Sequence, residues 1–224
     1  MIVIATYNYT EYLTNLLDSL NTTENLNENV LVVCTDPKQE KMIEFVSQLP
    51  SNNSYNFNII TDVAPRASYD SGAYIHAYQN YVDDYYIFLQ DSIAVKSPEW
   101  FNLFKEKRHE NKINPLLCFG MCWDNNEQKM WVEEKFEGNF IRPNIGVFGP
   151  IFQTSRKSLD KMNELHDLSK FMPNHKIKGQ QGMERGWAYL SVNSGIEIDS
   201  VDGAYYGESS FNSRCFNKFY LNRA

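Results

Sequence analysis

The sequence of 224 residues lacks the marks of several protein classes. No apolar run approaches the roughly 18 residues that a membrane span needs, so we expect no transmembrane segment. Positive charge is also scarce: 21 Lys and Arg against 28 Asp and Glu give a formal net charge of −7. Because affinity for a phosphate backbone rests on clustered basic side chains, this charge argues against nucleic acid as a partner. It leaves open a small phosphorylated ligand, which backbone amides or a metal ion can hold.

Cysteine is sparse and lacks the spacing of a zinc site. Cys34, Cys118 and Cys122 lie in or beside apolar runs, and Cys215 stands apart, so we expect buried, reduced thiols. The opening MIVIATYNYTEYL has no basic segment, and its apolar run is too short for a secretory signal. Together these features predict a cytoplasmic location, where thiols stay reduced.

Short apolar runs alternate with amphipathic segments from residue 2 to residue 92. A continuously apolar run such as 2–6 is typical of a strand buried on both faces of a sheet, and we expect further strands at 30–36, 55–62 and 85–92. Apolar residues at helical spacing predict helices at 10–20, at 38–49 and from Asp70 onward. This order predicts βαβ units and a parallel sheet.

Beyond residue 100 the alternation becomes less regular. We expect helices at 97–108, from about Ser155 within 146–165, and from about Gln181 to Val192, with strands at 115–123, 129–138 and within 195–209. No tract of the sequence marks a linker between two independent domains.

Polar residues stand where the predicted strands end. Ligands bind beyond the carboxyl ends of strands in open sheets of this kind, so we expect these residues to face one crevice. They are Thr6, Tyr7 and Asn8 after the first strand, Asp36 after the second, and Asp91 and Ser92 after the fourth. Asp91 has a simpler interpretation as an ordinary turn residue, and Asp36 as a cap of the helix that follows Pro37.

Four stretches together resemble a GT-A glycosyltransferase, most nearly of the family 2 type. They are IVIATYNYTEYLTNLLDSL, VLVVCTD, DSGAYIHAYQNYVDDYYIFLQDSIAVKSPEWF and GMERGWAYL. The resemblance implies an α/β fold, a GT-A (Rossmann-like) three-layer sandwich with a central, mostly parallel sheet. It also implies one domain over 1–224, with a nucleotide-sugar-binding half at 1–95 and an acceptor-binding half at 96–224. The short length suits either a minimal enzyme or one module of a longer protein with additional transferase domains.

The resemblance assigns roles to the polar strand ends. Asp36 would bind the nucleotide base, with Tyr7 against the base and Thr6 and Asn8 beside it. Arg66 would reach the diphosphate, because a guanidinium matches phosphate geometry. The remaining donor-binding candidates are Asp70, Gly72, Asp91 and Ser92.

A divalent cation, Mn²⁺ or Mg²⁺, is implied as the cofactor. The family usually holds it with Asp-x-Asp, whereas Gln90-Asp91-Ser92 offers one carboxylate. We expect Asp91 to hold the metal, since Mg²⁺ keeps several waters and accepts few protein ligands. Many relatives add a histidine after the base; none follows His175 here, and Asp202 is the candidate substitute.

Glu184 is the candidate catalytic base, which takes the proton of the acceptor hydroxyl in an inverting reaction. Trp187, one helical turn later, is the candidate platform for the acceptor sugar. Asp202 and Glu208 are rival bases, and an acid in a first helical turn is also favoured by the helix dipole alone.

We therefore predict a hexosyl- or deoxyhexosyltransferase that moves a sugar from a nucleotide-diphosphate donor, by default a UDP-sugar, to a hydroxyl of a glycan or other acceptor. The alternative is a non-catalytic module of the same fold that binds nucleotide-sugar or glycan. A nucleotidyltransferase ranks third, because ATYNYTEY lacks the Gly-rich, Lys/Arg-bearing loop of that class.

Overall fold

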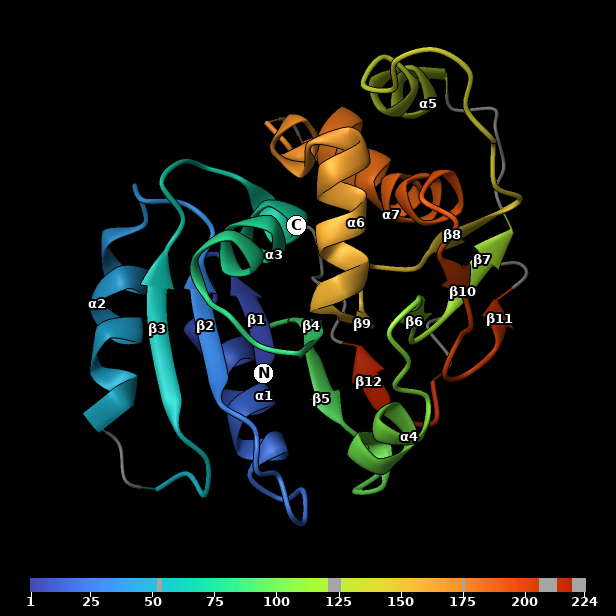
Figure 1. The fold of residues 1–224 in the computed structure, drawn as a ribbon. Coiled ribbons are helices and arrows are strands. Elements are labelled where there is room, and N and C mark those ends of the chain that lie inside the picture. The colour runs from blue at the N-terminus through green and yellow to red at the C-terminus, as the bar shows by residue number, and fades with distance from the viewer. Residues whose placement is uncertain (52–53, 121–125, 175, 206–212, 219–224) are drawn as a thin grey trace.

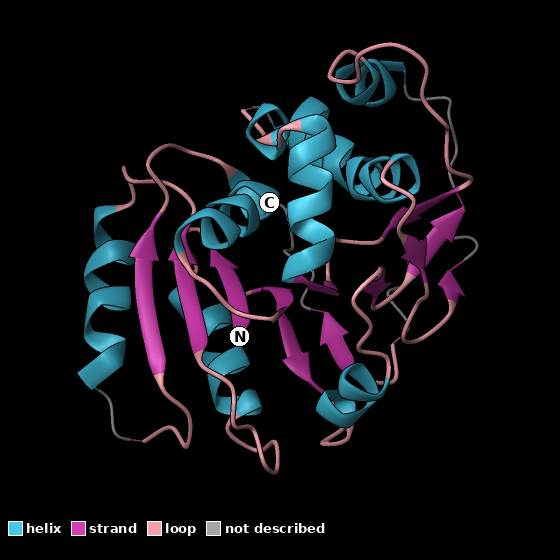
Figure 2. Ribbon diagram, in the orientation of Figure 1, coloured by secondary structure: helices cyan, strands magenta, loops and turns pink. Residues whose placement is uncertain are grey.

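The computed structural model describes residues 1–51, 54–120, 126–174, 176–205 and 213–218. A mostly parallel sheet runs through the centre of the molecule, with helices packed around it (Figures 1 and 2). The seven strands described in this sheet are, in spatial order, β10 (Glu197–Ile198), β6 (Lys112–Pro115), β9 (Phe152–Ser155), β4 (Tyr85–Gln90), β1 (Ile2–Thr6), β2 (Val30–Cys34) and β3 (Ile59–Val63).

The pairing within this sheet explains why it is only mostly parallel. β1 pairs in parallel with both β2 and β4, and β2 pairs in parallel with β3. β9 runs antiparallel to both of its neighbours, β4 and β6. Two small sheets complete the described strands: β7 (Cys118–Gly120) between β8 (Ile145–Val147) and β11 (Ala204–Tyr205), and β5 (Ile93–Val95) with β12 (Phe216–Lys218).

Helices cover both faces of the central sheet, so the molecule has three layers. Successive side chains of a strand point to opposite faces. In β1, Val3 and Ala5 enter one core with residues of α3 (Tyr69–Asn80), α6 (Arg156–His166) and α7 (Gln181–Asn193). Ile2 and Ile4 enter a second core with residues of α1 (Thr10–Leu20), α2 (Glu40–Gln48) and α4 (Trp100–Glu106).

Most predicted elements are present, and the two-faced burial of β1, β2 and β4 confirms the three-layer, mostly parallel fold. The predicted strand at 129–138 is wrong, because the chain there forms the helix α5 (Asn126–Glu133), which packs on α7. The predicted strand at 115–123 begins late, since β6 ends at Pro115 and β7 covers Cys118–Gly120; residues 121–123 lie outside the described part of the chain.

The expected thiols are observed where the structure describes them: Cys34, Cys118 and Cys215 are buried and free, and Cys122 lies outside the described residues. In the described part of the chain, no helix combines the length and the apolar character needed to cross a membrane.

Candidate active site

Asp91 joins the carboxyl ends of β1 and β4. Its backbone N–H donates to the carbonyl of Ala5 at 3.1 Å. Its carboxylate oxygen Oδ2 accepts a hydrogen bond from the Thr6 hydroxyl at 2.8 Å and one from the Tyr7 backbone N–H at 3.4 Å. Asp91 is thus more than an ordinary turn residue, because it orients the turn after β1 as well as its own.

Asp70 enters the same region from the first turn of α3. Tyr69, just before it, has a φ of 53°, a left-handed conformation that a bulky residue adopts only where the surrounding structure holds it. The Asp70 oxygen Oδ2 accepts hydrogen bonds from the Gln90 side-chain amide at 2.5 Å and from the Gln180 side-chain amide at 3.0 Å. Gln90 ends β4, so the head of α3 is tied to the end of that strand.

Glu184 comes from the opposite side, in the first turn of α7. This helix follows a π-helical turn at Lys176–Gln180, a rare element that is frequent at functional sites. The Glu184 side chain is half-buried, and the nearby backbone N–H of Gly149 acts to lower the pKa of its carboxyl group, against burial. α7 packs on β8, which ends shortly before Gly149.

Lys218 is the last described residue of β12, and its ammonium group lies among these carboxyl groups. The Nζ atom donates to the side-chain oxygen of Gln90 at 2.8 Å. Asp70, Asp91 and Glu184 all interact electrostatically with it. We call Asp70, Asp91, Glu184 and Lys218 the carboxyl cluster.

Burial shifts the proton equilibria of this cluster. It raises the pKa of Asp91 to about 7, against the hydrogen bond from Thr6, and the nearby Asp70 adds to the rise. It raises the pKa of Glu184 to about 7, against the attraction of Lys218, and that of Asp70 to about 6. Burial also lowers the pKa of Lys218. Carboxyl groups that exchange protons near neutrality are suited to general acid–base chemistry.

The architecture has counterparts among solved structures, although no protein-family profile and no curated protein matches the sequence. The chain is similar to S. aureus TarS 1-349, with a TM-score of 0.52, 15% sequence identity and coverage of 92% of this chain and 59% of that one. It is also similar to GalNAc-T7 with UDP, GalNAc and Mn²⁺, with a TM-score of 0.61, 12% identity and coverage of 92% and 43%. The chain has a GT-A fold.

GT-A is a fold of nucleotide-sugar glycosyltransferases, and at identities of 12–15% the likeness shows the fold alone. The chain spans 59% and 43% of the lengths of these two neighbours. The resemblance in the sequence is confirmed at the level of the fold, whereas the roles of individual residues stay predictions.

The predicted base-binding residues lie at the carboxyl ends of β1 and β2. Tyr7 and Asn8 are exposed, with 44% of Tyr7 accessible. The backbone N–H of Thr35 donates to the carbonyl of Thr6, so the two strand ends adjoin. Asp36 is buried, and its Oδ1 accepts the N–H of Lys38 at 2.9 Å. Asp36 therefore shapes the turn before α2 and is not the N-cap of that helix.

Other predicted donor residues are placed differently. Arg66 is exposed in the loop before α3, and Ser92 is half-buried in the turn after β4. Gly72 is buried, and a Cβ there would lie 2.3 Å from the Cβ of Ser68, so packing explains the glycine. This close approach draws the head of α3 onto the preceding loop.

Trp187 is not available as a sugar platform, and that prediction is wrong. Its side chain is fully buried, with its ring centroid 4.8 Å from that of Phe152 and its Nε1 donating to the Ser71 hydroxyl at 3.1 Å. Of the rival bases, Asp202 is engaged with Ser213 and Arg214, and Glu208 lies outside the described residues.

The ligands for the predicted divalent cation do not come together. Among the described residues, no three His, Cys, Asp or Glu side chains are placed to hold a metal ion. The Asp91 oxygen Oδ2 is already engaged by Thr6 and Tyr7, and the side-chain oxygen of Gln90 accepts from Lys218. Asp202, the candidate substitute ligand, is paired with Arg214. These residues do not fit a protein-held divalent cation.

Sequence reasoning missed Lys218, Gln90 and Gln180. For Lys218 a signal was present: in FNK, a lysine follows a buried phenylalanine at the strand period of two, which places both on one face of the strand. Gln90 had been noted only as a departure from Asp-x-Asp. Its amide bonds Asp70 while its carbonyl bonds Lys218, which a second aspartate could not do.

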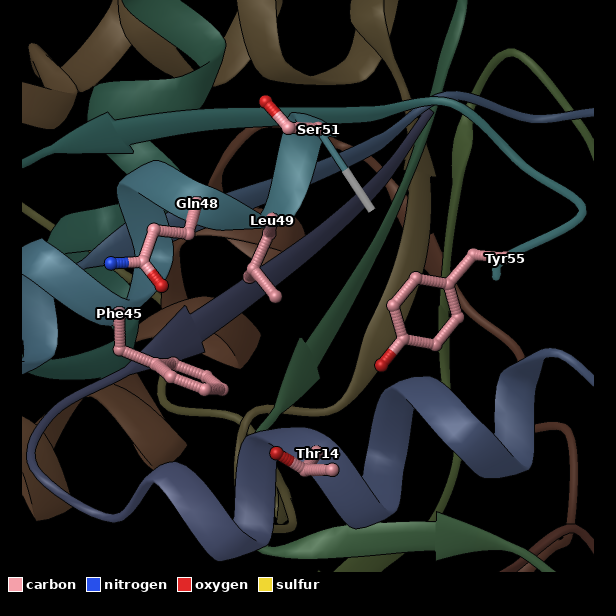
Figure 3. Close-up of a pocket in the computed structure, with 6 residues that line it drawn as sticks. All are labelled: Thr14, Phe45, Gln48, Leu49, Ser51 and Tyr55. Carbon is pink, nitrogen blue, oxygen red and sulfur yellow. The ribbon is translucent and has the colours of Figure 1, made fainter. Parts of the chain in front are cut away.

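A separate pocket of about 360 Å³ lies between α1 and the end of α2 (Figure 3). It is lined by Thr14, Phe45, Gln48, Leu49, Ser51 and Tyr55. None of these residues belongs to the carboxyl cluster, and the lining presents no carboxylate or cation, so it offers no chemistry for group transfer.

Proposed function

We propose that this chain is a glycosyltransferase that transfers a sugar from a nucleoside-diphosphate donor to an acceptor hydroxyl. The observation that carries the proposal is the convergence of Asp70, Asp91, Glu184 and Lys218 from four separate elements at the carboxyl end of the GT-A sheet. Such convergence of partly buried charge lowers stability and is kept where chemistry needs it.

The donor would bind along the ends of β1, β2 and β4. The base would lie against exposed Tyr7, with an N–H of uracil donating to Asp36, and UDP is the default nucleotide. Asn8 and Thr6 would contact the nucleoside from the turn after β1. Arg66, Asp70, Asp91 and Ser92 would line the path toward the diphosphate and the sugar. The cluster lies beyond these strand ends, as expected for a ligand site in an open sheet.

Glu184 is proposed as the base. Its pKa of about 7 lets it accept the acceptor's proton near neutral pH. The acceptor oxygen forms a bond to the anomeric carbon as the bond from that carbon to the diphosphate oxygen breaks. The electron pair leaves with the nucleoside diphosphate, and the hydroxyl proton passes to Glu184. A single base on the acceptor side favours inversion.

Residues 1–95 would hold the donor and residues 96–224 the acceptor. Because the neighbours are longer chains, we propose that further transferase or acceptor-binding domains accompany this one in the full protein. A cytoplasmic location and a glycan acceptor stay predictions from the sequence.

One observation favours a second candidate, a non-catalytic module that binds a nucleotide-sugar. Gln90 replaces a carboxylate of the Asp-x-Asp pattern, and the described residues offer no metal ligand set. Such a module would bind nucleoside diphosphates without turning over any donor.

The test is release of nucleoside diphosphate from a panel of UDP-, GDP-, CDP-, ADP- and TDP-sugars, with and without simple sugar acceptors. We expect turnover of at least one donor. Glu184→Gln should lower kcat by about 100-fold or more without weakening donor binding, since a positioned base contributes roughly 10²–10⁴-fold. Glu164→Gln, a matched change of an exposed acid on α6, should have no effect. Tight binding without turnover by the wild type would favour the non-catalytic module.

A further inference from the structure

Lys218 is held in the carboxyl cluster by the backbone and the core. β12 pairs antiparallel with β5, and the register places Lys218 opposite Ile93, two residues after Asp91. Phe216, in the same strand, is buried with its ring centroid 5.1 Å from that of Trp100. The strand is therefore anchored independently of the charge of its lysine.

The contacts of Lys218 direct its charge inward. Its Nζ donates to the Gln90 side-chain oxygen at 2.8 Å, and the amide nitrogen of Gln90 donates to Asp70. Gly149, with a φ of 59°, leaves room on the other side, because a Cβ there would lie 3.2 Å from Nζ. A larger residue at that position would crowd the ammonium group.

The charged groups around Lys218 come from three elements. Asp70 belongs to α3, Asp91 to the turn after β4 and Glu184 to α7. Each favours the charged form of the lysine, in opposition to burial. Arg185, next to Glu184, lies over the Phe119 ring at 5.4 Å and adds positive charge on the acceptor side.

The ammonium group of Lys218 lies where a divalent cation beside Asp91 would bind. In the Asp-x-Asp pattern, the position of Gln90 carries a carboxylate, whereas here its side-chain oxygen accepts from an ammonium group. A divalent ion beside Asp91 would be repelled by that ammonium in a partly buried site, where charges are weakly screened. Lys218 therefore disfavours a divalent cation at this position.

We propose that Lys218 is the built-in cation of the site: its ammonium group pairs with the donor diphosphate and replaces the divalent metal. The inference rests on the proposed function. As the bond from the anomeric carbon to the diphosphate oxygen breaks, the electron pair stays on the departing oxygen, and Lys218 neutralises the charge that develops there. The proton of the acceptor goes to Glu184, so Lys218 stays protonated throughout.

The experiment is calorimetric titration of the wild type and three variants with UDP and with uridine, in EDTA and again with Mn²⁺. If UDP is not bound, GDP, CDP, ADP and TDP with their nucleosides replace it. We expect the wild type to bind the diphosphate in EDTA, with no more than about a twofold change on adding Mn²⁺. Lys218→Met should weaken binding of the diphosphate by about tenfold or more, the loss of one charge-assisted contact, and leave nucleoside binding unchanged. Lys218→Arg should retain most of the affinity.

Lys112→Met is the matched control, because it removes one half-buried lysine from β6, where Glu197 and Asp199 are its partners. Its affinity for the diphosphate should equal that of the wild type. Diphosphate binding by the wild type only with Mn²⁺ overturns the inference and leaves the glycosyltransferase proposal intact. An equal loss of affinity for the nucleoside and the diphosphate in Lys218→Met also overturns the inference, since it indicates a structural role for the lysine. No binding of any nucleoside diphosphate under either condition defeats the proposed function itself, and the inference with it.

Discussion

Two groups of carboxylates lie at opposite ends of the parallel strands and differ in how their charge is balanced. At the amino end, Glu28 accepts hydrogen bonds from the Met1 amino group at 2.7 Å and from Arg108 at 2.6 Å. Burial acts to raise the pKa of Glu28, but these two cations outweigh it and hold the pKa below its ordinary value.

At the carboxyl end, three carboxyl groups face one lysine, and their pKa values rise to about 6 for Asp70 and about 7 for Asp91 and Glu184. Burial is the largest cause in each case. The contrast separates two arrangements of charge: one carboxylate is balanced by two cations at the amino end, whereas three acids share one lysine at the carboxyl end. The proposed glycosyl transfer would use this second arrangement, at a cost in stability.

The largest expected effect is at the carboxyl end. Asp91→Asn should lower donor turnover by about 100-fold, in the range found when one preorganised electrostatic group is removed. The amide retains the shape of the carboxylate and an acceptor for Thr6, so the fold should persist. Turnover equal to that of the wild type would show that Asp91 has no role in the proposed reaction.

The same variant tests the cost in stability. A raised pKa means that the carboxyl group favours folding in acid and loses that contribution as the pH rises through about 7. Urea unfolding gives the free energy of unfolding of Asp91→Asn minus that of the wild type. We expect this difference to be more favourable to the variant at pH 8 than at pH 5. An equal difference at both pH values would contradict the raised pKa.

The next effect is on the pH profile of kcat/KM. With a base of pKa about 7, activity should fall by about 30-fold from pH 8 to pH 5.5, because the unprotonated fraction drops tenfold per unit below the pKa. The apparent pKa belongs to the coupled carboxyl cluster as a whole. Residual activity of Glu184→Gln should lack most of this slope, and a flat wild-type profile would place the base elsewhere.

A smaller effect is expected at the amino end. Glu28→Gln leaves Arg108 without its carboxylate and should lower the free energy of unfolding by about 1–3 kcal/mol at pH 7. Because the pKa of Glu28 is lowered, its contribution is present above the ordinary value of 4.5 and disappears as the pH falls through the lowered one. Turnover per folded molecule should be unchanged. A loss of turnover would show that Glu28, at the amino end, also contributes to the activity that we assign to the carboxyl end.

The smallest effect marks the boundary of the donor site. Tyr7→Ala should raise the KM for the donor by roughly fivefold, about 1 kcal/mol of ring contact with the base, and leave kcat unchanged. Tyr9→Ala is the matched control, since Tyr9 is similarly exposed, at 42% against 44%, and packs on Tyr12. An equal rise in KM for the two variants would show that the nucleotide base does not bind at the turn after β1.

The first half of the fold was predictable because its strands are buried on both faces. Continuous apolar runs such as IVIAT and VLVVC have few alternatives to a central parallel strand. The leucines of α1 fall on one face of a helix and are all buried. Asp91 was found because a carboxylate that ends a buried strand is conspicuous in the sequence.

The second half was less predictable because packing decides it. In α5, the short apolar run Met130, Trp131 and Val132 suits a strand as well as a helix, yet contact with α7 selects a helix. Trp187 was misjudged because helical spacing from Glu184 does not reveal that its ring is enclosed by Phe88 and Phe152. Lys218 was missed because Asp70, Gln90 and Asp91 lie more than a hundred residues earlier in the chain, and only the fold brings them to it.

The pairing of β12 with β5 also has a consequence for the order of assembly. β12 follows the other described strands and helices in the chain, so the strand that carries Lys218 is synthesised after them. Its Phe216 belongs to the second core and packs on Trp100, so the step that completes this core also brings the ammonium group to the carboxyl groups. Packing and charge balance are therefore completed together.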